Sequence, residues 1–122
     1  MSGALRALAE RDAEALEALT TPDVLFEPAS TEVAERAPYR GHEGLRTYLA
    51  DLESTWDEFD VSVTEVRVGE RYAVALGRVY ARAGGAIADG PAAFVLEVRD
   101  ERVAWAKTFR DRAEALRFAG LE

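Results

Sequence analysis

The sequence predicts a single α+β domain, because helical segments come first and strand-like segments follow in one continuous series. Apolar residues recur at helical spacing across residues 4–19 and again across 42–57. From residue 61 to residue 110, four segments of strand composition alternate with short connections. Helices that precede the strands, rather than alternating with them, indicate a layer of helices packed on one face of a curved antiparallel sheet. A pocket between the two layers is the expected place for a ligand.

The N-terminal apolar stripe divides near Asp12, whose side chain can cap a second helix over Ala13–Leu19. Pro22 lacks a backbone N–H, so this helix has to end before it. Residues Val24–Pro28 then form a short predicted strand. Residues 29–41 show no apolar periodicity, and we expect a loop there.

The clearest helix spans His42–Asp57. Its apolar stripe consists of Leu45, Tyr48, Leu49, Leu52 and Trp56. A second capping signal, Asp111 followed by Glu114, predicts the start of a C-terminal helix that ends at Gly120.

Four predicted strands lie between these two helices. They are Val61–Val68, Tyr72–Arg82, Ala92–Arg99 and Arg102–Arg110. Gly69-Glu70 and Asp100-Glu101 are predicted turns, and Ala83–Pro91 is a predicted loose connection. Alternation divides the second strand into two faces. We expect the larger side chains, Val74, Leu76, Arg78 and Tyr80, to line the pocket, and the smaller ones, Ala73, Ala75, Gly77, Val79 and Ala81, to pack closely on the other side.

Composition excludes several classes of protein. The chain has 122 residues, enough for one domain over 1–122, and a net charge of −8 with no basic stripe, so nucleic acid is not an expected partner. It has no Cys and one His, which excludes disulfides, thiolate metal sites and sites that need two imidazoles. No apolar run approaches the roughly 20 residues of a membrane span. The N-terminus lacks the features of a secretory signal, and we expect a cytoplasmic protein. The predominance of Arg over Lys, together with the many Ala, favours a bacterial genome of high GC content.

Four phrases of the sequence, in this order, resemble the SnoaL-like branch of the nuclear transport factor 2-like superfamily, which includes ketosteroid isomerase, limonene epoxide hydrolase and polyketide cyclases. The phrases are Arg11-Asp12-Ala13-Glu14-Ala15-Leu16, Pro22-Asp23-Val24-Leu25-Phe26-Glu27-Pro28, Tyr39-Arg40-Gly41-His42-Glu43-Gly44-Leu45 and Phe109-Arg110-Asp111-Arg112-Ala113-Glu114-Ala115-Leu116. The resemblance implies a cone-shaped α+β roll with an apolar cavity, and a homodimer packed through the sheets. It does not settle function, because this fold hosts isomerases, hydrolases, cyclases, binders and inactive scaffolds.

Glu27 matches the position of the isomerase branch's catalytic carboxylate. A carboxylate beside an apolar pocket has a raised pKa and can act as a general base. The alternative is an acidic strand end that is hydrogen-bonded for structure. The isomerase's oxyanion hole is not matched, because its acid falls near Phe94 and its tyrosine near Ala4.

The epoxide hydrolase branch carries an Arg and two Asp residues that activate water. The matching positions here are Arg78, Tyr80 and Thr108, so both carboxylates are missing and that hydrolysis is not expected. Arg78 could still hold an anionic group of a ligand. Its alternative role is an internal ion pair with Glu27 or Glu97.

Aromatic residues provide the remaining candidates. The fold would place Tyr39 and Trp56 at the cavity mouth, where they could contact a flat apolar ligand or pack in the core. The same alignment turns Thr108 inward, and therefore turns Trp105 and Lys107 outward toward a dimer interface. The alternative is a register shifted by one residue, which would turn Trp105 and Lys107 toward the cavity. His42, at a helix start, is more typical of a capping or exposed residue than of a catalyst, and no metal site is indicated around it.

Two hypotheses follow. In the first, a small, largely apolar molecule binds in the cone and undergoes cofactor-free proton transfer, with Glu27 as base and Arg78 or Tyr80 stabilising negative charge. Tyr39, Trp56, Phe94 and Thr108 would then contact the ligand. In the second, the domain is a non-catalytic carrier or a dimeric scaffold. Convergence of Glu27, Arg78 and Tyr80 around an open cavity would favour the first.

Overall fold

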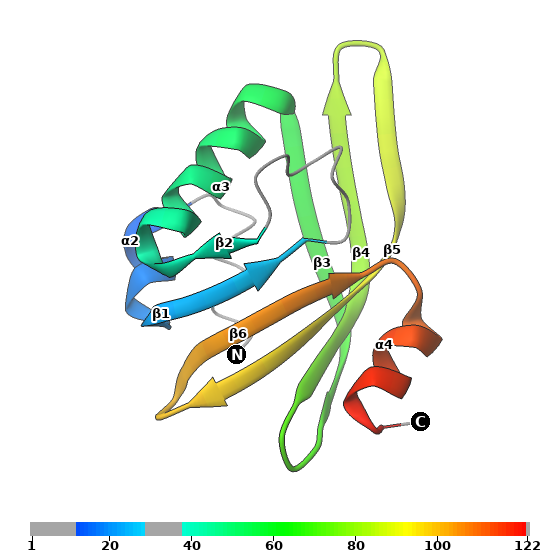
Figure 1. The fold of residues 1–122 in the computed structure, drawn as a ribbon. Coiled ribbons are helices and arrows are strands. Elements are labelled where there is room, and N and C mark those ends of the chain that lie inside the picture. Colours follow the sequence, from blue (N-terminus) through cyan, green and yellow to red (C-terminus); the bar gives the residue numbers. More distant parts are fainter. Residues whose placement is uncertain (1–11, 29–37, 122) are drawn as a thin grey trace.

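The computed structural model describes residues 12–28 and 38–121 and shows a curved, unclosed sheet with helices on both of its faces (Figure 1). The strands are β1 (Thr20–Glu27), β2 (Tyr39–Arg40), β3 (Glu58–Val68), β4 (Ala73–Ala83), β5 (Ala86–Arg99) and β6 (Arg102–Phe109), and the helices are α2 (Ala13–Ala18), α3 (Gly41–Thr55) and α4 (Arg112–Ala119). The strand order is β2-β1-β6-β5-β4-β3. The predicted α+β class is confirmed.

The two predicted helix caps are present. Asp12 accepts a hydrogen bond from the backbone N–H of Ala15 at 3.1 Å and so starts α2. Asp111 accepts from the N–H groups of Ala113 and Glu114 at 2.8 and 3.3 Å, and α4 ends at Gly120 in the left-handed conformation. The predicted helix over residues 4–11 lies outside the described residues.

The long helix α3 covers one face of the sheet because its apolar stripe is buried there. Leu45, Tyr48, Leu49 and Leu52 are its buried residues, and Leu52 is fully buried. The helix begins at Gly41, whose φ of +68° suits glycine, and a Cβ there would lie 3.2 Å from the carbonyl oxygen of Pro22. The observed bounds differ from the predicted His42–Asp57 by one residue at the start and two at the end.

Two strand features were not predicted. Residues 39 and 40, expected to be loop, form β2, in which Tyr39 pairs antiparallel with Phe26. Strand β1 begins at Thr20, passes through Pro22, and pairs parallel with β6. A two-residue strand has no periodicity to read, and a parallel pairing between distant segments depends on the tertiary fold.

The predicted loose connection over Ala83–Pro91 is wrong. Strands β4 and β5 continue as a long hairpin around Gly84-Gly85, with Tyr80 opposite Asp89 and Arg82 opposite Ile87 (Figure 1). Gly90 and Pro91 lower the local strand propensity, but the pairing with β4 holds this segment in an extended conformation.

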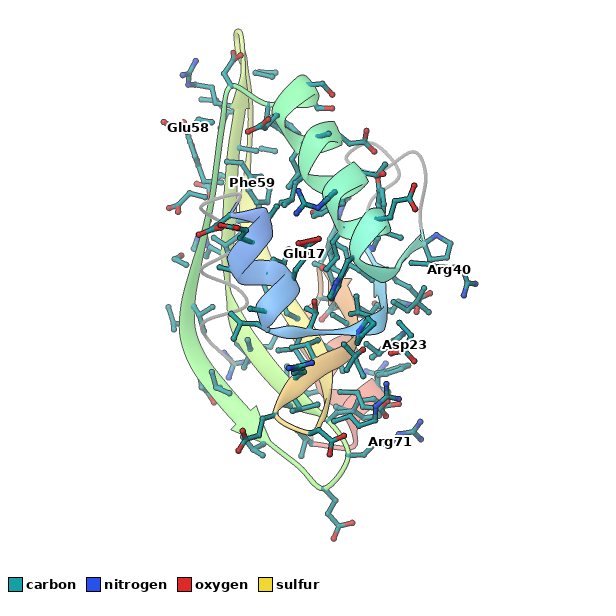
Figure 2. The ribbon with its side chains drawn as sticks, turned by 90° about the vertical axis from the view of Figure 1, so that its left-hand side faces the viewer. Glu17, Asp23, Arg40, Glu58, Phe59 and Arg71 are labelled. Atoms are coloured by element: carbon teal, nitrogen blue, oxygen red, sulfur yellow. The ribbon has the colours of Figure 1, made fainter. Side chains whose placement is uncertain are left out.

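Each face of the sheet carries its own apolar core. On the side that we call the α3 face, Phe26, Tyr48, Leu52, Phe59 and Leu96 belong to one cluster. On the opposite side, which we call the α4 face, a second cluster of Val74, Leu76, Val95, Phe109 and Leu116 packs against α4. Figure 2 marks the two ends of the β3–β4 pair by Glu58 and Arg71 and shows α2 and α3 on the same side of the curved strands.

Candidate functional site

Strand register determines which residues reach the α3 face. Phe94 is opposite Ala75 on β4 and Thr108 on β6, so these three residues share that face. Because side chains alternate, Trp105 and Lys107 lie on the α4 face. The predicted inward direction of Thr108, and the outward direction of Trp105 and Lys107, are therefore confirmed.

A small apolar cavity of about 50 Å³ lies between α2, α3 and the sheet. The residues that line it are Leu16, Thr20, Val24, Phe26, Leu45, Tyr48, Phe94, Leu96, Val103 and Ala106. Phe94 is thus a cavity residue, and its predicted contact with a ligand stays a prediction. Ligand pockets usually measure about 300–1,000 Å³, so this cavity alone has room for one small group of a larger molecule.

A larger pocket of about 390 Å³ opens on the same face, at the end of the sheet formed by the β3–β4 and β5–β6 turns. Its apolar wall consists of Leu19, Val68, Ala73, Leu96, Val98 and Val103, and its rim carries Glu70, Arg71, Tyr72 and Glu101. Leu96 and Val103 also line the small cavity, so the two spaces share a wall. We call this larger space the turn-end pocket.

Tyr39 and Trp56 lie in the core beside the cavity and are not among the residues that line it. Tyr39 is 2% exposed, and its hydroxyl donates a hydrogen bond to Asp51 at 2.8 Å. Trp56 follows the last turn of α3, and its buried indole N–H has no hydrogen-bond partner among residues 12–28 and 38–121. A buried N–H without a partner costs roughly 1–3 kcal/mol, so this group is available to an acceptor.

Glu27 does not face the cavity, which corrects the predicted placement. It lies beside Lys107 in the parallel β1–β6 register, on the α4 face, where its Oε2 accepts a hydrogen bond from the Trp105 indole at 2.9 Å. The neighbouring residue, Phe26, has the opposite orientation and lines the cavity. Alternation along β1 therefore sends the carboxylate to the other side.

Arg78 and Tyr80 also lie on the α4 face, and the predicted assignment of the two faces of β4 is reversed. Their strand neighbours Val74 and Leu76 pack against α4, while the smaller Ala75 and Ala81 lie on the α3 face. The concave side of a curved sheet has less room for each residue, which favours small side chains there. Arg78 forms an exposed ion pair with Asp89 at 3.2 Å.

Glu27 and Arg78 cannot converge on one substrate atom. Strands β6 and β5 separate β1 from β4, which places the two residues about 14 Å apart across the sheet at the usual strand spacing. Neither the expected ion pair between Arg78 and Glu27 nor the pair between Arg78 and Glu97 forms, because Glu97 binds Arg71 instead. The catalytic roles of Glu27, Arg78 and Tyr80 remain predictions without a shared site.

His42 has a structural position near the start of α3. Its Nε2 lies 3.3 Å from the carbonyl oxygen of Thr20, which ties α3 to β1. Within residues 12–28 and 38–121, no group of three or more potential ligands could hold a metal ion. No helix in these ranges is long and apolar enough to cross a membrane.

Two charge effects matter at the α3 face. Burial, and secondarily the nearby Tyr39, raise the pKa of the Tyr48 phenol, which therefore stays protonated and neutral in the cavity wall. At the turn-end pocket, the hydrogen bond and ion pair with Glu97 at 3.0 Å raise the pKa of Arg71. The Arg71 guanidinium also lies 5.0 Å from the centre of the Tyr72 ring.

Sequence reasoning missed the turn-end pocket. Gly69-Glu70 and Asp100-Glu101 were predicted only as turns, and nothing in a linear pattern shows that two separate turns border one space. One signal was available, because Val68 and Val98 place apolar side chains next to predicted turns. They are 73% and 44% exposed in the structure.

Comparison with known proteins places the chain in a family. The model of the SnoaL-like domain matches residues 2–106, and the chain belongs to that family. No curated protein matches the sequence significantly.

Solved structures share the fold at low sequence identity. A nuclear transport factor 2-like protein of unknown function from Burkholderia pseudomallei has a TM-score of 0.78 at 19% identity, covering 95% of this chain and 91% of its own. A ketosteroid isomerase-like protein from Catenulispora acidiphila, in complex with trimethylamine, has a TM-score of 0.77 at 17% identity, covering 99% and 92%. IdmH, a proposed polyketide cyclase from Streptomyces antibioticus, has a TM-score of 0.72 at 19% identity, covering 98% and 94%. These likenesses establish the fold alone.

Proposed function

We propose that this SnoaL-like protein is a small-molecule binding protein that holds a largely apolar organic ligand on the α3 face of its sheet. The observation that carries the proposal is that Leu96 and Val103 line both the small cavity and the turn-end pocket, so the two spaces lie next to each other on this face. Both spaces have apolar walls, and their volumes are about 50 and 390 Å³. The larger volume falls within the range of ordinary ligand pockets.

The geometry argues against proton transfer by Glu27 to a ligand in the small cavity. Among the described residues that line the small cavity, Tyr48 is the one titratable group, and its raised pKa makes it a hydrogen-bond donor rather than a base. Glu27, the predicted general base, lies on the opposite face and is held by Trp105. Proton transfer with Glu27 as the base would need that carboxylate within hydrogen-bond reach of the substrate.

Structural neighbours support a small organic ligand in general terms. The Catenulispora acidiphila protein was solved with trimethylamine, and the Streptomyces antibioticus protein is proposed to act in polyketide cyclisation. At 17–19% identity these proteins share the fold, and a fold by itself does not specify a ligand. The class of ligand therefore has to be tested on this chain.

The test uses N-phenyl-1-naphthylamine, a neutral apolar dye that becomes fluorescent when it leaves water. We expect saturable binding to the native protein. Val98→Trp should reduce binding at least about tenfold, because the indole would fill the mouth of the turn-end pocket. Ile87→Trp is the matched control, because Ile87 is also an exposed apolar residue of β5 but lies near the hairpin tip.

Two further results complete the test. Glu27→Gln should leave dye binding unchanged. A loss of binding in this variant would indicate that the dye binds on the α4 face. Absence of saturable binding, or equal binding by the Val98→Trp and Ile87→Trp proteins, would refute the proposed function.

We also propose that the protein forms a homodimer through the α4 face. Trp105, Tyr72 and Phe118 form an aromatic cluster there with ring centres 5.5–5.7 Å apart, and Phe118 remains 45% exposed. Aromatic residues that are partly exposed in one subunit are typical of interface centres. Light scattering at micromolar concentration should give twice the monomer mass, and Phe118→Glu should give the monomer mass. A native monomer would contradict this proposal.

A further inference from the structure

We infer that the turn-end pocket selects a small organic cation with an apolar tail over an anion of the same size. This inference rests on the proposed ligand-binding function and adds the charge of the ligand. Two features of the pocket support the inference. Its wall consists mainly of valines and leucines, and its rim carries carboxylates that form no ion pair within the described residues.

The wall of the pocket would take the apolar part of the ligand. Leu96 and Val103 are 3% and 6% exposed and form the deep part, where the pocket meets the small cavity. Val68 and Val98 form the outer part, and these residues are 73% and 44% exposed to water. Covering such apolar surface contributes about 25 cal/mol for each Å², so an alkyl or aromatic tail is favoured there.

Among the described residues, the rim carries two carboxylates and one cation, and that cation is already paired. Arg71 forms an ion pair with Glu97, whose side chain belongs to the α4 face, so the charge of the guanidinium is offset from that side. Glu70 and Glu101 border the pocket and form no ion pair within the described part of the chain.

Nearby arginines do not reverse this balance. Arg99 and Arg102 are opposite each other at the β5–β6 turn, and alternation places both on the face away from Val98 and Val103. Arg99 is further held by Asp23 at 2.8 Å. Among residues 12–28 and 38–121, a ligand in the turn-end pocket therefore meets two carboxylates, and no guanidinium without a carboxylate partner, on its own side of the sheet.

The backbone of the β5–β6 turn has an unfavourable conformation at two residues that are not glycine. Asp100 and Glu101 have φ values of +53° and +66°, a two-residue turn in which glycine is the easiest second residue. A glutamate in the left-handed region is conformationally costly. Its side chain lines the turn-end pocket, and a role for the carboxylate in ligand binding gives that cost a function.

The test compares three probes with a common six-carbon chain: hexyltrimethylammonium, 1-hexanol and hexanoate. Each is titrated into isotopically labelled protein while the amide signals of Gly69, Tyr72 and Val98 are followed by NMR. We expect the cation to bind about fivefold or more tightly than hexanoate, with 1-hexanol between them. Added salt should narrow the difference, because exposed charges are screened.

Charge reversal provides the decisive variant. Glu101→Lys should lower the affinity for hexyltrimethylammonium and raise that for hexanoate, each two- to fivefold. A gain of anion binding cannot result from misfolding. Glu53→Lys on α3 makes the same change in net charge at an exposed position outside the pocket, and it should leave the preference unchanged.

The outcomes separate the two proposals. If none of the three probes shifts the pocket signals and the neutral dye also fails to bind, the proposed function itself is refuted. If 1-hexanol binds but hexanoate binds as well as the cation, the pocket is a ligand site without charge selection and this inference fails. An equal response to Glu101→Lys and Glu53→Lys would likewise overturn it, because the effect would then come from net charge.

Discussion

A substitution of Gly77, in the middle of β4, would test whether the bulge in β3 brings the two strands into close contact. Strand β3 contains an extra residue, Thr64, between the pairs Val63–Gly77 and Glu65–Leu76. The bulge brings the backbone of β3 against Gly77, so that a Cβ on Gly77 would lie 1.8 Å from the carbonyl oxygen of Ser62. Ordinary contacts of a Cβ are 3.4–4 Å, and the atom in the way belongs to the backbone, which cannot rotate aside.

Gly77→Ala should therefore force β3 and β4 apart locally. Overpacking of this kind costs about 1–3 kcal/mol, and weakening one or two backbone hydrogen bonds adds about 1 kcal/mol. We expect a loss of about 3 kcal/mol in the free energy of unfolding. For a chain of this length, that corresponds to a melting temperature lower by roughly 10 °C.

The assay is urea denaturation followed by circular dichroism, supported by calorimetry. Gly90→Ala is the matched control, because Gly90 lies in β5 on the neighbouring strand and a Cβ there meets nothing within 4 Å. That variant should change stability by less than about 1 kcal/mol, in either direction. If the two variants behave alike, the bulge does not bring β3 against Gly77 and the reasoning fails.

Three other predictions concern the helices. Leu52→Ala should lower the free energy of unfolding by about 3 kcal/mol in urea, because Leu52 is fully buried under α3, and a loss below about 1 kcal/mol would contradict that packing. Asp111→Ala should cost about 1 kcal/mol by removing the cap of α4, whereas an unchanged urea midpoint would show that the cap is dispensable. Arg46 lowers the pKa of Glu17 from its ordinary value of 4.5, chiefly through a hydrogen bond, so their pairing stabilises the fold above about pH 4.5 and is lost as the pH falls through the folded-state pKa. Arg46→Gln should therefore be less stable than the native protein at pH 7, and the difference should shrink as the pH falls to 3; a difference that does not shrink would argue against this pairing.

Local signals account for the elements that the sequence predicted well. Asp12 and Asp111 cap helices because a short acidic side chain reaches the free N–H groups of the next turn, whatever the rest of the chain does. The stripe from Leu45 to Leu52 defines α3 by its period, and the period survives in any fold that buries it. Family resemblance extended these elements to the correct α+β fold.

Local signals also explain the errors. Gly90 and Pro91 have low strand propensity, yet they belong to β5 because a partner strand lies alongside. Alternation along β4 correctly predicted that Arg78 and Gly77 lie on opposite faces. It could not predict which face lines the cavity, because the two faces of a strand are equivalent until another layer covers one of them. The position of α4 made the face with Arg78 the outer one.

The candidate site, like the fold, could be predicted only in part from the sequence. From the sequence alone came the helix caps, the periods of the helices and strands, and the α+β class. Only the tertiary structure decided that Glu27 points toward Trp105, and that the β3–β4 and β5–β6 turns border a common pocket. The reason is physical: a period depends on neighbours along the chain, whereas a pocket depends on the pairing of strands and on the bulges that shift their register.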